Sequence, residues 1–336
     1  MEPLLSVVCI TYNHEKYIRQ CLDGILMQKT NFPFEIVISD DVSKDETHNI
    51  IKTYANNVLN VEIRDVSPSN NLGVINNWRH AHDCIRGKYV AYCEGDDYWI
   101  DDNKLQKQVD YLESHPECGM CITDFRIQVD TQSAKSKPAF GSLSFPKPII
   151  FQEHLFNAGY IGPMTWVYRA ELFRGFNYSE MNLTDASFAL ALDYFATSKV
   201  VYLDDVTSVY RTHSGSAANQ GDNKKEFIYN RGVFNTQVEY AMKYNIKKQD
   251  LVRLKIQGYT GLILCALAAD NMKFVDEALA FFRLQGMEMS WFVQNCKEYV
   301  WYRKQYEKVS KSRAYRYGKL LLKPIKKVRG SGSNCK

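Results

Sequence analysis

The sequence predicts an α/β fold: a Rossmann-like, mostly parallel sheet with a C-terminal helical region. Short apolar runs rich in β-branched residues alternate with segments of helical periodicity from residue 5 to about residue 93. Such alternation is typical of parallel strands joined by right-handed crossovers. From residue 223 onward the periodicity is helical. The 336 residues, 45% of them hydrophobic, suffice for one large domain with an appendage, or for two domains.

The expected strands of the N-terminal half are short apolar runs, as in strands buried on both faces. Between them, apolar residues recur every three or four positions, the period of an amphipathic helix. Ser43 and Glu46 have the spacing of a capping box, so a helix is expected to begin there. The strands are expected at 5–11, 34–39, 61–64 and 89–93, with helices around 17–26, 50–54 and 75–85.

The same patterns continue along the rest of the chain, with a polar loop expected at 131–150. Further strands are expected at 119–129, 162–168, 200–203 and 206–210, and helices at 104–112, 151–157 and 188–195. The C-terminal helices are expected at 227–244, 248–269, 273–285 and 291–308.

Charge is distributed unevenly. Residues 311–336 contain nine basic residues and no acid, whereas the rest of the chain has 33 basic and 38 acidic residues and a net charge of −5. Apolar residues lie among these lysines, which favours contact with an anionic membrane surface, although a solvated tail is the simpler alternative. Nine scattered cysteines, with no signal peptide and no long apolar span, indicate reduced thiols and a cytoplasmic location. No motif for binding nucleic acid accompanies the tail.

Three carboxylates follow the expected strand at 89–93 directly: Glu94, Asp96 and Asp97. Acids this close repel one another and resist burial. A bound Mg²⁺ or Mn²⁺ would relieve the repulsion, since both ions prefer oxygen ligands. The alternative is an acidic surface turn. The preceding strand favours a metal site, because ligands of open α/β sheets bind at the carboxyl ends of the strands.

Polar residues also follow the first two expected strands. Tyr12 and Asn13 follow the first, and Asp40 and Asp41 follow the second. An aspartate can accept a hydrogen bond from the imide N–H of uracil, and a tyrosine can stack on a base, so a nucleotide is the expected ligand. The alternative for the two aspartates is favourable charge at a helix N-terminus. The glycine-rich Rossmann fingerprint and the Walker A loop are absent from the sequence.

Five segments together resemble the bacterial family-2 glycosyltransferases of the glycosyltransferase A fold. They are 6–13 (SVVCITYN), 38–45 (ISDDVSKD), 71–73 (NLG), 94–97 (EGDD) and 210–213 (YRTH), within a match over roughly 4–216. The resemblance implies an inverting, metal-dependent transferase. It would move a sugar from a nucleoside diphosphate sugar, with a UDP-sugar favoured, to an acceptor hydroxyl. Cell-surface polysaccharide, lipopolysaccharide or capsule biosynthesis is the implied setting, with a carbohydrate or lipid-linked acceptor.

The resemblance also implies roles for individual residues. Asp185 matches the position of the catalytic base. Asp96 and Asp97 are the favoured metal ligands over Glu94, which replaces the usual first aspartate of the family's motif. The implied nucleotide-binding residues are Thr11, Tyr12, Asn13, Glu15, Asp40, Asp41 and Asn71, together with Arg211 and His213, which match a segment that closes over the diphosphate.

The chemistry suits these residue types. A carboxylate within reach can take the acceptor's proton, and a cation can neutralise the leaving diphosphate. Three alternatives stay open: Asp185 as a helix N-cap, a nucleotidyltransferase, and a non-catalytic module that binds nucleotide sugars. The expected division is a catalytic domain at 1–218, a helical region at 219–310 and a basic tail at 311–336. Peripheral attachment of the protein to the inner face of the plasma membrane is the alternative to a freely cytoplasmic location.

Overall fold

The computed structural model describes residues 2–57, 61–129, 150–158, 161–176, 183–213 and 222–311. The chain divides into two compact units, Met1–Lys255 and Ile256–Lys336. The first unit contains all of the predicted site residues and also the first helix of the C-terminal region. The division of function predicted at residue 218 stays a prediction. The expected polar loop at 131–150 and the basic tail lie almost wholly outside the described residues.

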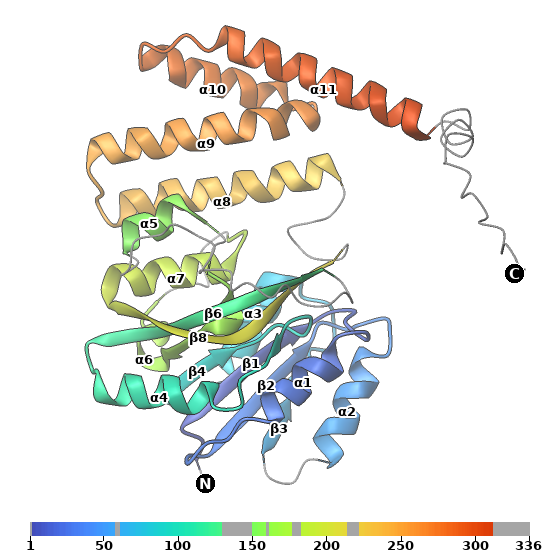
Figure 1. The fold of residues 1–336 in the computed structure, drawn as a ribbon, viewed down its shortest axis with the longest axis vertical. Coiled ribbons are helices and arrows are strands. Elements are labelled where there is room, and N and C mark those ends of the chain that lie inside the picture. The colour runs from blue at the N-terminus through green and yellow to red at the C-terminus, as the bar shows by residue number, and fades with distance from the viewer. Residues whose placement is uncertain are drawn as a thin grey trace, which may run out of the picture. The chain divides into compact units, whose positions relative to one another are not determined.

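An eight-stranded mixed sheet forms the centre of the first unit (Figure 1). Its strand order is β3-β2-β1-β4-β7-β6-β8-β5. The pairs β1–β2, β1–β4, β2–β3 and β6–β8 are parallel, whereas β4–β7, β6–β7 and β5–β8 are antiparallel. The strands are β1 (Leu5–Thr11), β2 (Phe34–Asp40), β3 (Glu62–Asp65), β4 (Tyr89–Tyr92), β5 (Tyr98–Trp99), β6 (Cys118–Val129), β7 (Val167–Arg169) and β8 (Lys199–Thr212).

The predicted α/β class and the mostly parallel sheet are confirmed. Every residue of β1, β2 and β4 is buried, as their continuous apolar runs predict. Two expectations about strands are wrong. Residues 162–168 do not form one strand, because Pro163–Thr165 form a short 3₁₀ helix and β7 begins only at Val167. Residues 200–203 and 206–210 are not two strands but parts of the single strand β8. Ile122 pairs with Tyr202 and Asp124 with Val206, so β8 carries two extra residues at this point. Asp204 and Asp205 lie in this bulge, which makes one strand look like two in the sequence.

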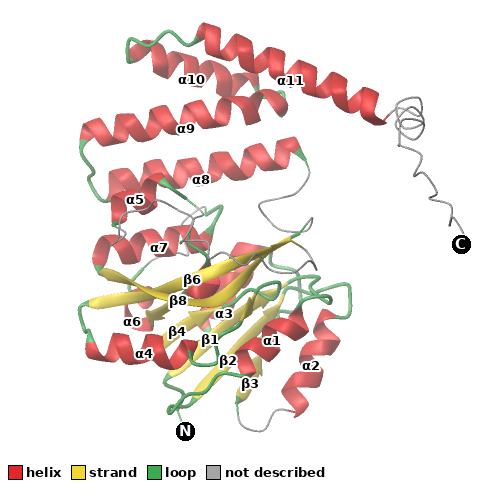
Figure 2. Ribbon diagram, viewed as in Figure 1, coloured by secondary structure: helices red, strands yellow, loops and turns green. Residues whose placement is uncertain are grey.

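Helices cover the sheet (Figure 2). Helix α3 contacts β1 and β2, α4 contacts β6 and β7, and α7 contacts β8. The helices of the first unit are α1 (Ile18–Leu26), α2 (Thr47–Asn57), α3 (Val74–Asp83), α4 (Lys104–Ser114), α5 (Phe151–Phe156), α6 (Ala170–Arg174), α7 (Ala186–Thr197) and α8 (Asn223–Lys243), with a short 3₁₀ helix, η2 (Pro163–Thr165).

The second unit is helical, as predicted. It contains most of α9 (Lys248–Ala268), then α10 (Met272–Leu284) and α11 (Ser290–Lys311). Tyr259 of α9 packs against Phe274 and Phe281 of α10, with ring centroids 5.6 and 5.0 Å away. Within the described part of the chain, α9 is the one helix whose length and composition would let it cross a membrane.

Candidate active site

The loops that follow β1, β2 and β4 meet at one edge of the sheet. Thr11 pairs with Asp40 at the ends of β1 and β2. Beyond β4, the N–H of Cys93 donates to Val8 O and that of Gly95 to Ile10 O, which keeps the acidic segment beside β1. A Cβ on Gly95 would lie 2.5 Å from Thr11 Oγ1, so only glycine fits here. The predicted carboxylates therefore begin where the parallel strands end.

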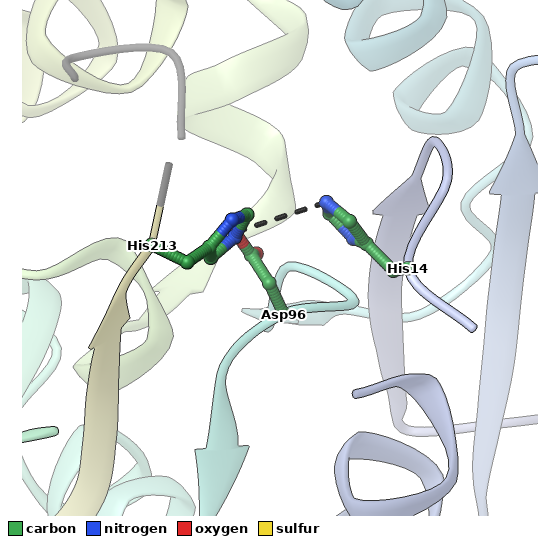
Figure 3. A group of neighbouring side chains, drawn as sticks. All are labelled: His14, Asp96 and His213. Atoms are coloured by element: carbon green, nitrogen blue, oxygen red, sulfur yellow. Dashed lines mark hydrogen bonds and ion pairs between the residues drawn. The ribbon is translucent and has the colours of Figure 1, made fainter. Parts of the chain in front are cut away.

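Asp96 lies between two histidines from distant parts of the chain (Figure 3). Its Oδ2 is 2.9 Å from Nε2 of His213 and 3.8 Å from Nε2 of His14. Burial raises the pKa of Asp96, but the hydrogen bond with His213 and the charge of His14 outweigh burial, so the pKa is lowered overall. One donor atom from each of the three residues lies within 4.8 Å of the others, close enough to share a metal ion.

Glu94, Asp96 and Asp97 form a second group with donor atoms this close together. Asp97 is 1% exposed, and its Oδ1 accepts a 2.7 Å hydrogen bond from the backbone N–H of Arg211. Its Oδ2 is buried with no hydrogen-bond partner in the described structure. Burial, then Asp96 and Glu94, raise the pKa of Asp97 well above its usual value. Burial, then Asp96, raise that of Glu94 to about 8. Three acids with one unpaired buried oxygen fit a divalent cation.

His14 is a functional candidate that the sequence reasoning missed. Its backbone N–H donates to Thr47 Oγ1 over 2.8 Å, which ties the β1–α1 loop to the start of α2. Burial lowers the pKa of its imidazole. In the sequence, His14 is one polar residue of a loop. Its position next to Asn13, in the loop that follows the first strand, is the one available signal.

Arg211 holds the acidic segment in place. Its guanidinium lies over the rings of Tyr17 and Tyr98, 4.7 and 5.0 Å from their centroids. It donates to the backbone carbonyl of Asp96 and, over 2.5 Å, to Gln20 Oε1. The residue is 2% exposed. The phosphate contact predicted for Arg211 stays a prediction, and it would require this guanidinium to exchange some of these partners.

The two aspartates at the carboxyl end of β2 bind neighbouring loops. The Asp41 carboxylate accepts from the N–H groups of Leu72 and Gly73 over 2.7 and 2.9 Å, and Asn71 Nδ2 donates to Asp41 O. Gly73 has a φ of 77°, a left-handed conformation that favours glycine. The predicted residues Asp41 and Asn71 therefore lie together at the start of α3.

Asp40 accepts hydrogen bonds from Ser43, whose side chain also accepts from the Asn13 N–H over 2.7 Å. The capping-box expectation is wrong, because α2 begins only at Thr47 and Ser43 is used to join two loops.

The predicted residues Asn13 and Glu15 lie in the same network: Asn13 Oδ1 accepts from Lys44 N–H, and Glu15 Oε2 from Glu46 N–H. Tyr12 is 39% exposed at this edge.

Asp185 faces a cavity of about 310 Å³ that Glu94 and Asp96 also line. Aromatic side chains form much of its wall, among them Trp78, Trp166, Tyr210 and Tyr229. Asp185 is also the N-cap of α7, because its Oδ1 accepts from Phe188 N–H over 3.0 Å. The alternative that Asp185 is a helix N-cap is therefore correct. The same residue also lines the cavity. Tyr229, from the helical region where the sequence showed no catalytic pattern, was missed.

Residues 6–176 match the model of glycosyl transferase family 2. The chain belongs to this family. Among curated relatives, an uncharacterised protein of Mycobacterium tuberculosis is 34% identical over 210 residues, covering 62% of this chain and 59% of that protein. The putative teichuronic acid biosynthesis glycosyltransferase TuaG of Bacillus subtilis is 30% identical over 126 residues, covering 38% of this chain and 48% of TuaG. The chain thus spans less than two thirds of the length of these relatives.

Solved structures share the fold of this family-2 chain. S. aureus TarS 1–349 in complex with UDP-GlcNAc matches with a TM-score of 0.53 and 16% identity, covering 85% of this chain and 93% of that one. The mannosyltransferase PcManGT from Pyrobaculum calidifontis, in complex with GDP-Man and Mn²⁺, matches with a TM-score of 0.55 and 14% identity, covering 96% and 84%. These likenesses confirm the predicted glycosyltransferase A type of fold.

Proposed function

We propose that this chain is an inverting, metal-dependent glycosyltransferase that moves a sugar from a nucleoside diphosphate sugar to an acceptor hydroxyl. One observation carries the proposal: Asp185 faces the same cavity as Glu94 and Asp96. A candidate base and a candidate metal group thus meet at one space large enough for reacting groups. Family membership and the nucleotide sugars held by TarS and PcManGT support the reaction class.

Asp185 would act as the general base. The acceptor oxygen forms a bond to the anomeric carbon while its proton passes to the Asp185 carboxylate. The bond between that carbon and the diphosphate oxygen breaks, and its electron pair leaves with the nucleoside diphosphate. One displacement of this kind inverts the anomeric centre. A carboxylate within hydrogen-bond reach is a suitable acceptor for the proton.

Asp96 belongs to both candidate metal groups. One group contains Asp97 and Glu94, and the other contains His14 and His213. When bound, Mg²⁺ or Mn²⁺ would neutralise charge on the leaving diphosphate. The loops around Tyr12, Asn13 and Asp41 would hold the nucleoside. UDP is favoured, since Asp41 could accept from the uracil imide.

Transfer from UDP-sugars with Mn²⁺, measured for the wild type, Asp97→Ala and Asp185→Asn, tests the proposal. Both variants should lose at least about a hundredfold in kcat, because each removes a group used in the transition state. Asp222→Asn is the matched control, since Asp222 caps α8 by accepting from Lys224 N–H, away from the cavity. An Asp185→Asn variant with wild-type transfer would disprove the base assignment.

We further propose that the chain works in cell-surface polysaccharide assembly on the cytoplasmic side of the membrane. TuaG supports the setting through the biosynthesis named for it. Four exposed aromatic residues of α11 support membrane contact next to the nine basic residues of 311–336: Trp291 (77% exposed), Tyr299 (56%), Trp301 (57%) and Tyr302 (65%). Amphipathic aromatics and cations together suit an anionic lipid surface.

Flotation with vesicles containing about a quarter phosphatidylglycerol tests the membrane proposal. The full chain should float, whereas a chain ending at Ser310 should bind much less, since each basic residue near such a surface contributes roughly 1 kcal/mol. Vesicles of phosphatidylcholine alone are the control. Equal flotation of the two chains would contradict a role for the tail.

A further inference from the structure

We propose that helix α8 belongs to the catalytic machinery, because Tyr229 positions the Asp185 carboxylate for proton transfer. The inference rests on the proposed function, in which Asp185 is the base. Tyr229 lies outside the residues that match the family model, 6–176, so family membership assigns it no role. Its hydroxyl lies 2.8 Å from Asp185 Oδ2.

The direction of this hydrogen bond follows from its surroundings. Tyr229 is mostly buried, and burial, followed by the charge of Asp185, raises the pKa of its phenol. The hydroxyl therefore keeps its proton and donates a hydrogen bond to the carboxylate. A hydrogen bond to a charged acceptor is stronger than one between neutral groups.

The hydrogen bonds of Asp185 identify the oxygen that would take the acceptor's proton. Oδ1 accepts from Phe188 N–H over 3.0 Å and from Ser187 Oγ over 2.6 Å. These two donors occupy both of its lone-pair directions. Oδ2 accepts from Tyr229 alone among the described contacts, so one of its lone pairs stays available toward the cavity. Tyr229 thereby fixes the torsion of the carboxylate about its last bond.

The backbone of α8 makes a second, independent contact at the same place. A Cβ on Gly232 would lie 1.9 Å from Thr184 Oγ1 and 2.6 Å from Thr184 Cβ. Residues 229 and 232 are three apart and share one face of the helix. This face thus contacts Thr184 and Asp185 together, and a glycine is required for the close approach.

Farther along, α8 is attached to α7. Asp193 is fully buried in α7 and accepts from Tyr240 and Lys243 over 2.9 and 2.7 Å, and from Tyr244 over 2.5 Å. Asp185 caps the N-terminus of α7, and Asp193 lies about two turns later in the same helix. The two helices are therefore joined at both places, so α8 sets the position of the first turn of α7.

Steady-state kinetics of Tyr229→Phe test the inference, because the change removes one oxygen and keeps the ring. We expect kcat to fall about tenfold, with the KM for the donor within twofold of the wild type, since a lost hydrogen bond to a charged group has roughly this effect. Tyr259→Phe in α9 is the matched control: it removes a phenol that also binds a carboxylate, that of Glu277, and neither residue lines the cavity. Its kcat should stay within twofold of the wild type.

A double-mutant cycle separates positioning from a general structural effect. In an Asp185→Asn background, Tyr229→Phe should change the residual rate less than twofold. Gly232→Ala, which pushes α8 away from Thr184, should lower kcat at least as much as Tyr229→Phe. Full activity of Tyr229→Phe beside an inactive Asp185→Asn would overturn the inference and leave the proposed function intact. An active Asp185→Asn would instead overturn the base assignment itself.

Discussion

His213 Nε2 lies 2.9 Å from Asp96 Oδ2, although 117 positions separate the two residues in the chain. Asp96 follows β4 near the middle of the sheet, and His213 follows β8 near its far edge. The contact brings an imidazole to a carboxylate that two other acids already approach. The metal site therefore has two candidate ligand sets. Glu94, Asp96 and Asp97 offer oxygen atoms alone, whereas His14 and His213 add two nitrogen atoms to Asp96, so the two sets favour different metal ions.

The first prediction distinguishes these two sets. His213→Ala should weaken Mn²⁺ binding about tenfold or more, because losing a ligand or its orienting partner commonly has that effect. Mg²⁺ binding should change less, since Mg²⁺ prefers oxygen to imidazole. Titration calorimetry without donor measures both affinities.

Glu94→Gln is the companion variant for this measurement. It should leave Mn²⁺ affinity within about threefold of the wild type if Asp96 and the histidines supply the ligands. The reverse pattern, with Glu94→Gln weakening binding and His213→Ala having no effect, would assign the metal to the three acids.

The second prediction concerns the glycine beside Thr11. Gly95→Ala should displace the acidic segment, because the new Cβ would lie 2.7 Å from Thr11 Cβ. Overpacking of this kind typically costs about 1–3 kcal/mol of unfolding free energy, and Mn²⁺ affinity should fall with it. Urea unfolding and calorimetry measure the two effects.

Gly261→Ala in α9 is the control for this substitution, since its Cβ would have no atom within 4 Å. In a helix interior this change should raise stability by up to about 1 kcal/mol. A Gly95→Ala variant with wild-type stability and metal affinity would contradict the close packing inferred at Gly95.

The third prediction is a pH effect on stability at His82. Its Nδ1 lies 2.8 Å from Trp78 O and its Nε2 2.7 Å from the Tyr168 hydroxyl. Burial lowers the pKa of His82 to about 4, from 6.5. The unfolded chain therefore binds this proton more tightly than the folded protein, so the stabilisation is present above pH 6.5 and is lost as the pH falls toward 4.

Between pH 7 and pH 5 this group alone should reduce the unfolding free energy by about 2 kcal/mol. Urea unfolding of the wild type and His82→Phe at both pH values isolates the contribution, because all other titrating groups are shared. Equal loss of stability in the two proteins over this range would show that His82 does not titrate as inferred.

The fourth prediction concerns the attachment of α8. Asp193→Ala should lower the unfolding free energy by about 3 kcal/mol, because it leaves the hydroxyls of Tyr240 and Tyr244 without their acceptor. Amide hydrogen exchange should accelerate in 223–243 more than in β1. Exchange that increases equally in both segments would indicate global destabilisation instead.

The sequence was sufficient for most of the sheet and helices, because burial imposes periods that a single segment displays. The run at 5–11 is an example, since it forms β1 over the same residues. It was insufficient where a residue acts through a distant partner. His14 and Tyr229 have no local pattern, since what makes them candidates is contact with Asp96 and Asp185. Ser43 had the right spacing for a cap, but hydrogen bonds to Asp40 and Asn13 were the stronger competitors.

The acidic segment is fastened at both ends: Gly95 bonds to β1, and Tyr98–Trp99 pairs with Ser208 and Val209 of β8. Most of these partners are far away in sequence, so the segment acquires its geometry only when the last strand has joined the sheet. A fragment ending at residue 176 would contain every acid of the metal group yet lack Arg211 and His213. During synthesis, the site is therefore among the last features of the first unit to form, because closing such long loops delays contacts that depend on them.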